Sequence, residues 1–92
     1  MTYENWRESI RQEYTIMVNL SYYLNGAGHT RMKALEILYR LSEQCHTPEQ
    51  LLDRVDRQEL PVDDLNLIFT RTGYVWVEML RNEVASRETD CD

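Results

Sequence analysis

Apolar residues recur every three or four positions along most of the chain, and this spacing constrains the fold more strongly than any other feature of the sequence. In residues 3–24, for example, the residues near one face of a helix are Trp6, Ile10, Met17, Leu20 and Leu24. No strand-like alternation competes with this pattern, and three glycines with two prolines are few for a sheet joined by tight turns. The sequence therefore predicts an all-α protein.

Turn and capping residues divide this helical pattern into four segments. Asn25-Gly26 predicts the end of the first helix, because glycine accepts the left-handed conformation just past a last turn. Thr30 then predicts the cap of the second helix, and Leu60-Pro61 separates the third helix from the last. The result is a predicted compact bundle with helices at about 3–24, 31–44, 48–58 and 62–86, and a frayed tail after 86.

The second and third helices have the clearest signals. The buried stripe of the second is predicted to contain Leu35, Leu38, Leu41 and Cys45. The third helix begins at Thr47-Pro48-Glu49-Gln50. There the threonine can cap, the proline is preset for the first helical position, and the glutamine can complete a capping box. This start signal predicts a helix directly after the Cys45-His46 pair.

One long helix is predicted for the C-terminal part of the chain. Its buried stripe is predicted to consist of Leu65, Ile68, Thr72, Val75 and Met79, widened by Trp76, Leu80 and Val84. Gly73 interrupts this stripe, and glycine costs a helix about 1 kcal/mol relative to alanine. We therefore expect either close packing or a kink at Gly73.

Length and composition predict one soluble domain. The 92 residues support a single core, so residues 1–92 are expected to form one domain. No run reaches the about 18 apolar residues of a membrane span. The N-terminal sequence has neither a basic leader nor an apolar stretch, so no secretion signal is expected and the predicted location is cytoplasmic. Cys45 and Cys91 are both expected to stay reduced.

The net charge of −6 is unevenly distributed along the chain. Residues 1–46 balance five acids with five bases, whereas residues 49–64 contain six acids and two bases, a local charge of −4. A protein that binds DNA directly usually has a basic stripe that neutralises phosphates. We therefore expect no direct nucleic-acid binding, and a protein partner with a basic surface.

Two short motifs suggest chemistry but have simpler interpretations. Cys45-His46 lies near Glu43 and Glu49, as part of a metal or nucleophile cluster could. A structural zinc site normally needs its full tetrahedral set of ligands, whereas the two cysteines and two histidines here have no metal-binding spacing. We interpret the pair as a buried cysteine beside a loop histidine.

The glycines of Gly26-Ala27-Gly28 could suggest a phosphate-binding loop, but the segment lacks the preceding strand and the lysine of such a loop. The sequence thus predicts no metal, no cofactor and no enzymatic activity.

The chain is rich in aromatic residues, with two tryptophans, six tyrosines and one phenylalanine. Trp6, Phe69 and one of Tyr74 and Trp76 are expected in the core, with the tyrosines half-buried. Taken together, tyrosine and tryptophan beside an acidic surface favour an interaction face, since these side chains give contact area at low entropic cost.

A series of residues between about 35 and 85 follows a recognisable order along the predicted helices. The series comprises Tyr39-Arg40-Leu41, Cys45, Thr47, Leu51, Asp53-Arg54-Val55, Leu60, Asp63-Asp64-Leu65 and Ile68-Phe69. In this order and in its helix lengths, the chain resembles the Hha/YmoA proteins, which are small helical bacterial regulators. The resemblance implies a protein that binds nucleoid-structuring proteins of the H-NS type and modifies gene silencing.

The resemblance also implies a role for Asp53, which occupies the place of an acid that helps bind arginines of the partner. A second acid of the family would fall near Gly73, where this chain has none, and Ser42-Glu43-Gln44 replaces the family's basic cluster. The predicted N-terminal helix is an addition in this chain.

As a whole, the sequence predicts a non-enzymatic protein-binding regulator, and a modulator of an H-NS-type silencer is its most specific form. In the predicted recognition edge, Asp53, Asp56 and Glu59 face basic partner residues, while Tyr74 and Trp76 add buried area. Two alternatives stay open. One is a small acidic inhibitor or immunity-type protein that blocks a basic, nucleic-acid-handling partner. The other is a homo-oligomeric structural subunit whose interface is formed by the first and last helices.

Overall fold

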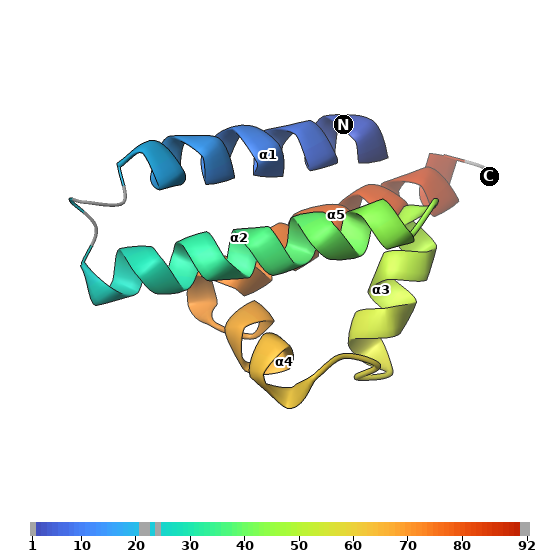
Figure 1. Cartoon of the computed structure of the whole chain (residues 1–92). Helices are drawn as coiled ribbons and strands as arrows, with labels where there is room; N and C mark the ends of the chain where they lie inside the picture. The colour runs from blue at the N-terminus through green and yellow to red at the C-terminus, as the bar shows by residue number, and fades with distance from the viewer. Residues whose placement is uncertain (1, 21–22, 24, 91–92) are drawn as a thin grey trace.

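A computed structural model describes residues 2–20, 23 and 25–90 of the chain. Its helices are α1 (Tyr3–Asn19), α2 (Gly26–Gln44), α3 (Pro48–Asp56), α4 (Val62–Ile68) and α5 (Arg71–Asp90) (Figure 1). No strand occurs among the described residues, so the all-α prediction is confirmed. The predicted number of helices is wrong, because the C-terminal part of the chain forms two helices instead of one.

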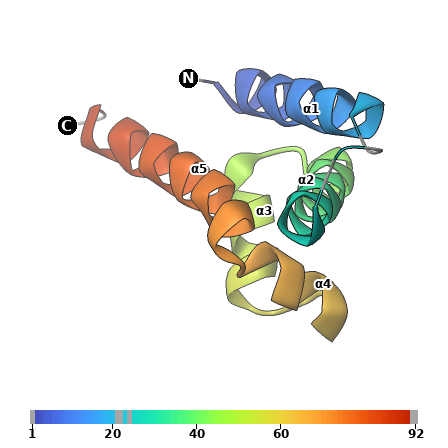
Figure 2. The same cartoon turned by 90° about the vertical axis from the view of Figure 1, so that its left-hand side faces the viewer.

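Helix α2 occupies the middle of the molecule. Helices α1 and α4 lie on opposite sides of α2, and both α3 and α5 also contact it (Figure 1 and Figure 2). The fully buried core residues include Trp6, Ile10, Leu35, Leu38, Leu51, Val55, Ile68, Val77 and Leu80. The stripe predicted for α2 is confirmed, since Leu41 and Cys45 are also buried.

The junction between α1 and α2 differs from the prediction. Helix α1 ends at Asn19, and Leu24, the predicted end, lies outside the described residues. Asn25 caps α2 instead of ending α1, because its Oδ1 accepts a hydrogen bond from the Gly28 amide at 2.9 Å. Thr30 lies inside α2, where its hydroxyl donates to the Gly26 carbonyl at 3.0 Å. Asparagine favours helix starts and also the position after a helix end, so Asn25-Gly26 alone is ambiguous.

The predicted start of α3 is confirmed. The Thr47 hydroxyl accepts from the Gln50 amide at 3.2 Å, and Pro48 is the first helical residue. The Gln50 side chain accepts from the amide of His46 at 2.8 Å, one residue before the amide that a capping box would bind.

The end of α3 comes earlier than the predicted residue 58, at Asp56. Gln58 has a positive φ of 57°, a left-handed conformation that stops the helix. The Glu59 amide donates to the Arg54 carbonyl at 2.9 Å, and the Gln58 amide donates to the Val55 carbonyl at 3.1 Å. These two bonds satisfy carbonyls that the helix itself leaves unpaired.

A sharp break separates α4 from α5, where the sequence predicts one helix over 62–86. The Thr70 hydroxyl donates to the Leu67 carbonyl at 2.6 Å, and its oxygen lies 3.3 Å from the Gly73 amide as acceptor. A Cβ on Gly73 would lie 2.8 Å from the carbonyl oxygens of Leu67 and Ile68 and 3.2 Å from the Ala34 Cβ. The expected close packing at Gly73 is therefore confirmed, and it occurs where α4 turns into α5.

The break changes which face of α5 is buried. Val77 and Leu80 are fully buried, whereas Val75, which the sequence places in the buried stripe, is 53% exposed. Phe69 is also predicted to be a core residue and is 48% exposed. Both predictions are wrong because they assume that one helical phase continues from residue 62 to residue 86. Helix α5 also extends past that predicted end, to Asp90.

Three side chains of α1 hold it against the rest of the molecule. The Tyr3 hydroxyl donates to the carbonyl oxygens of Cys45 at 2.9 Å and Ser42 at 3.2 Å, at the end of α2, where helical carbonyls have no partner within the helix. The Arg7 Nε donates to the Ser42 hydroxyl at 3.1 Å. The indole of the fully buried Trp6 donates to the Trp76 carbonyl at 2.9 Å, which connects α1 to α5.

Replacement of Gly73 by alanine should destabilise the domain, although alanine favours helices. The added methyl group would collide with backbone carbonyls, so we expect the free energy of unfolding to fall by about 1–3 kcal/mol in urea denaturation. Gly26→Ala is the matched control, since a Cβ at Gly26 meets nothing within 4 Å. Equal effects of the two substitutions would contradict the close packing at Gly73.

Tyr3→Phe should cost about 1–3 kcal/mol of unfolding free energy at neutral pH, because two buried carbonyls lose their donor. Burial, with a smaller contribution from Cys45, raises the pKa of Tyr3 to about 12. The unfolded pKa is about 10, so the protonated hydroxyl stabilises the fold below pH 10. This contribution disappears as the pH rises through 12, and Tyr3→Phe should remove it from the alkaline unfolding profile. Tyr23→Phe, at an 86% exposed residue, should leave the neutral-pH stability unchanged.

Candidate functional site

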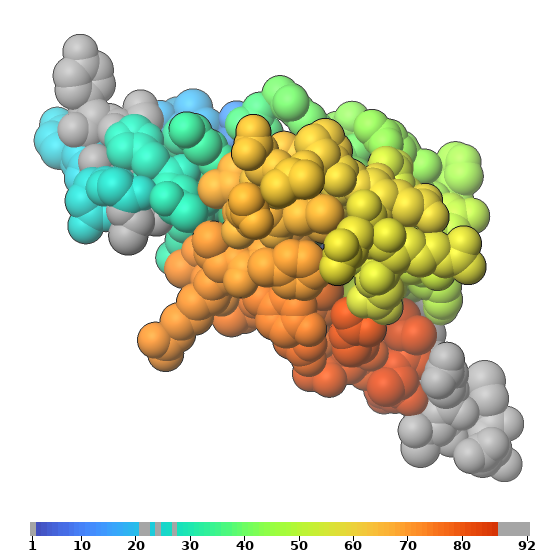
Figure 3. Space-filling model, turned by 90° about the horizontal axis from the view of Figure 1, so that it is seen from below, coloured from blue at the N-terminus to red at the C-terminus, as the bar shows by residue number. Residues whose placement is uncertain are grey.

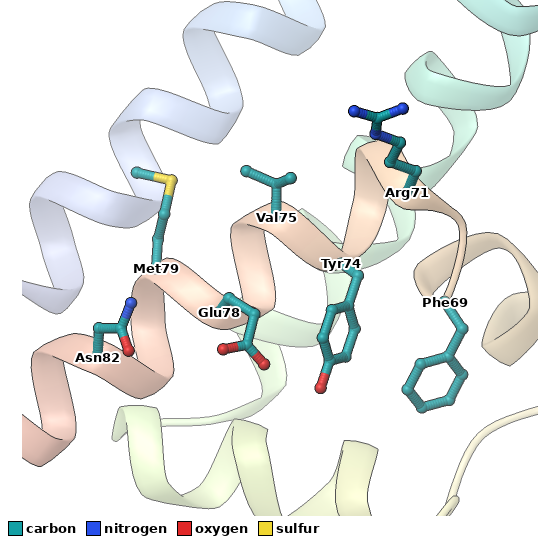
Figure 4. A pocket seen from close by; sticks show the side chains of 7 residues that line it. All are labelled: Phe69, Arg71, Tyr74, Val75, Glu78, Met79 and Asn82. Atoms are coloured by element: carbon teal, nitrogen blue, oxygen red, sulfur yellow. The ribbon is translucent and has the colours of Figure 1, made fainter.

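An apolar groove runs along the outer face of α5. It has a volume of about 650 Å³ and is lined by Phe69, Arg71, Tyr74, Val75, Glu78, Met79 and Asn82. The rings of Phe69 and Tyr74 lie next to each other, with centroids 5.8 Å apart (Figure 4). Val75 and Met79 project from the next row of the same helix (Figure 4). The groove therefore presents two aromatic rings, one branched aliphatic side chain and one thioether to the outside.

The helix break produces this groove. Phe69 is the cap residue after α4, so its side chain leaves the α4 stripe just where the chain turns. The exposed rows of α5 then follow from the burial of Val77 and Leu80, because residues four apart lie on the same face of a helix. The predicted stripe misses the groove because it places Val75 in the core. Met79 is partly buried against the core and also lines the groove. The sequence signal for a new helix at this point is Thr70, three residues before Gly73, because threonine commonly caps the start of a helix.

A chain of polar contacts connects the groove to α3. The Glu78 carboxylate beside the Tyr74 hydroxyl raises the pKa of that tyrosine. The Arg81 Nε lies 3.7 Å from Glu78 Oε1, and its terminal nitrogens donate to both Asp56 oxygens at 2.9 and 3.2 Å. These hydrogen bonds from Arg81 hold the pKa of Asp56 below its usual value. The polar chain fixes the border between the groove and the acidic helix.

The acidic segment 49–64 lies beside α5. Figure 3 shows the end of α3, the following loop and α4 on one face of the molecule, next to α5. A hollow of about 320 Å³ between α3 and α5 is lined by Glu49, Leu52, Asp53, Asp56, Arg81, Val84 and Ala85. We call this hollow and its carboxylates, with Glu59 just beyond the end of α3, the acidic edge.

Basic residues of the same chain already contact the predicted partner-binding acids. Asp53 Oδ1 lies 3.1 Å from the Arg57 Nε, and Glu59 lies 4.0 Å from the same arginine. Asp56 is bound by Arg81. All three acidic side chains are nevertheless about half exposed, so their remaining acceptor positions face water.

The two predicted aromatic contact residues are not in one place. Tyr74 lies in the groove, and its contacts lead through Glu78 and Arg81 to Asp56. Trp76 accepts the Trp6 hydrogen bond through its backbone carbonyl. Its side chain lines another hollow of about 200 Å³, together with Arg31, Thr72, Val75 and Met79, and the last two residues also line the groove. The structure thus places Tyr74 with the acidic edge and Trp76 apart from it.

The Cys45-His46 pair has structural surroundings. Cys45 is a buried free cysteine whose carbonyl accepts from Tyr3, and His46 is exposed. Within the described part of the chain, no group of three or more histidine, cysteine or acidic residues could hold a metal ion. Cys91 lies outside the described residues.

Among the described residues, no helix is both long enough and apolar enough to cross a bilayer.

Comparison with known proteins adds no relative: no family model, curated protein or solved structure matches the chain. The candidate site is therefore interpreted from its own geometry. Its two parts are the apolar groove on α5 and the acidic edge, and Arg81 connects them because it contacts Glu78 of the groove and Asp56 of the acidic edge.

Arg81→Gln should raise the pKa of Asp56 toward the ordinary value of about 3.9, because the carboxylate loses two charged hydrogen bonds. A carbon-detected NMR titration of the Asp56 carboxyl group measures this change. The lowered pKa stabilises the fold above that ordinary value, and the contribution is lost as the pH falls through the folded pKa. Since both side chains are partly exposed, the loss of stability at neutral pH should stay below about 1 kcal/mol. Arg57→Gln, which leaves Arg81 in place, should not move the Asp56 titration.

Proposed function

We propose that the chain is a non-enzymatic protein-binding domain that uses the α5 groove and the adjoining acidic edge. The observation that carries this proposal is the exposure of Phe69 and Val75 in one groove, although both are large apolar side chains. Apolar surface left in water costs about 25 cal/mol per Å², so a contiguous apolar groove favours coverage by another surface.

The composition of the groove supports a protein partner. Aromatic residues, methionine and arginine are enriched in protein interfaces, and lysine is depleted there. The groove contains Phe69, Tyr74, Met79 and Arg71, and no lysine. Buried aromatic anchors surrounded by a polar rim are also where binding energy concentrates. In this proposal the anchors are Phe69 and Tyr74.

The acidic edge supplies orientation and encounter rate. Residues 49–64 carry a local charge of −4, with six acids against two bases, which attracts a basic protein surface. Because Asp53 and Asp56 already contact arginines, a basic partner binds their remaining acceptor positions or displaces Arg57. The Hha/YmoA resemblance narrows such a partner to an H-NS-type silencer, and this narrower proposal rests on the sequence alone.

Capture of partners from the lysate of the source organism tests the proposal, with tagged wild type compared with Val75→Glu. A charge in the middle of the groove should reduce partner recovery at least about tenfold, since it leaves an unpaired charge in an apolar contact. Val62→Glu is the matched control, because Val62 is 71% exposed and lies outside the groove. Equal recovery with Val75→Glu and wild type would overturn the role of the groove.

Two further experiments test the role of the acidic edge in partner binding. Combined Asp53→Lys and Asp56→Lys substitutions should slow association with a basic partner, measured by surface plasmon resonance, while circular dichroism confirms that the helices persist. Nuclease treatment and added DNA separate two kinds of partner. A silencer complex persists under both treatments, whereas a charge-mimicking inhibitor is displaced from its partner by DNA.

A further inference from the structure

We propose that the α5 groove is covered by the same groove of a second copy of the chain, in a two-fold symmetric dimer with antiparallel α5 helices. This inference rests on the proposed function, because it names the protein that the groove binds. It commits the groove to a second copy of the chain. Other partners then bind the paired acidic edges of the dimer, so Val75→Glu weakens their capture by separating the two copies.

The charges of the groove are self-complementary. Arg71 and Glu78 are seven residues apart, which is about two helical turns and about 10 Å along α5, so they lie on one face. Their midpoint is the Tyr74–Val75 level. In an antiparallel pair with its two-fold axis at that level, Arg71 of each copy faces Glu78 of the other. Two equivalent ion pairs form, as a symmetric interface requires.

The apolar side chains of the groove match in the same register. Tyr74 and Val75 of both copies meet at the axis. Phe69 and Tyr74 lie on one border of the groove, and Val75 and Met79 lie on the other (Figure 4). Because the two-fold axis crosses the helices in the plane of the interface, each border packs against the same border of the other copy. The aromatic border then meets itself at the axis through Tyr74, and the aliphatic border meets itself through Val75. One register satisfies both the charged and the apolar residues.

Arg71 also differs from most of the arginines that the structure describes, because it has no carboxylate partner among the described residues. Other arginines form ion pairs with carboxylates of the same chain: Arg11, Arg31, Arg40, Arg57 and Arg81. Arg71 is exposed and has no carboxylate partner among the residues that the structure describes. Glu78 contacts Tyr74 and Arg81, yet a carboxylate can accept about four hydrogen bonds.

A basic partner fits the groove less well than a second copy. It could pair with Glu78 but would bring positive charge next to Arg71, and juxtaposed like charges oppose binding. A second copy brings one base and one acid in the matching positions. The dimer then displays two acidic edges, which allows bivalent binding of a basic partner.

Charge-swap variants test this arrangement by sedimentation equilibrium of the full chain. Wild type should be a dimer, and Arg71→Glu or Glu78→Arg alone should weaken the dimer by about tenfold or more, since each creates two like-charge contacts. An equimolar mixture of these two variants should associate again, because one chain then carries two acids and the other two bases at the facing positions. The double variant Arg71→Glu/Glu78→Arg should also recover the dimer. Lys33→Glu, at an exposed residue of α2, carries the same change in charge as Arg71→Glu and should leave the dimer intact.

Each outcome of these experiments supports or overturns the proposed dimer. A wild-type monomer at all concentrations overturns the dimer, and the proposed function still stands if Val75→Glu loses its partner from the lysate. A dimer that is insensitive to Arg71→Glu also overturns the proposal, because its interface lies elsewhere. Arg71 is exposed at the first position of α5, where an acid suits the helix, so a folding defect does not obscure this variant.

Discussion

Gly73 packs its backbone against the carbonyls of Leu67 and Ile68 and against the methyl group of Ala34. This approach is too close for any side chain, and it sets the direction in which α5 leaves α4. With that direction fixed, Val77 and Leu80 enter the core and Val75 faces outward. The exposed Phe69 and the whole α5 groove follow from the same contact. A continuous helix over the same residues would have a different buried face and no groove.

The position of α1 depends on a second kind of contact. The ends of helices leave carbonyl groups without partners, and the Tyr3 hydroxyl occupies those at the end of α2. Trp6 reaches a carbonyl of α5 through its indole and fills the space between the helices. Both contacts come from the first two turns of α1. Near its other end, the buried Met17 and the ion pair between Glu13 and Arg31 of α2 hold the helix, while Ile16 faces water.

Local signals predict local structure well in this chain, including the break at Leu60-Pro61, but they do not decide the break before α5. The cap of α3 could be identified from Thr47-Pro48, because the threonine acts within three residues of itself. The stripe of α2 could be identified because a single phase continues through it. The break before α5 has one local signal, the capping Thr70, and the apolar residues outweigh it because they keep an apparently helical spacing across Phe69 and Thr70 while the actual phase changes. The sequence shows that Gly73 costs the helix stability. Its close packing against Ala34, far away in sequence, is visible only in the folded structure.

The candidate site shows the same limit. Its acids could be found from charge alone, whereas the arginine that binds Asp56 comes from α5 and requires the fold. Once Arg57 and Arg81 are accounted for, the acidic edge is a charged border with its carboxylates already oriented, and fixed carboxylates bind a basic surface with less loss of conformational freedom. The apolar groove has the opposite character, because it has little net charge and a large area for tight packing. The proposed function therefore assigns the encounter rate and the lifetime of a complex to different surfaces of this domain, and the Asp56–Arg81–Glu78 contacts connect those surfaces.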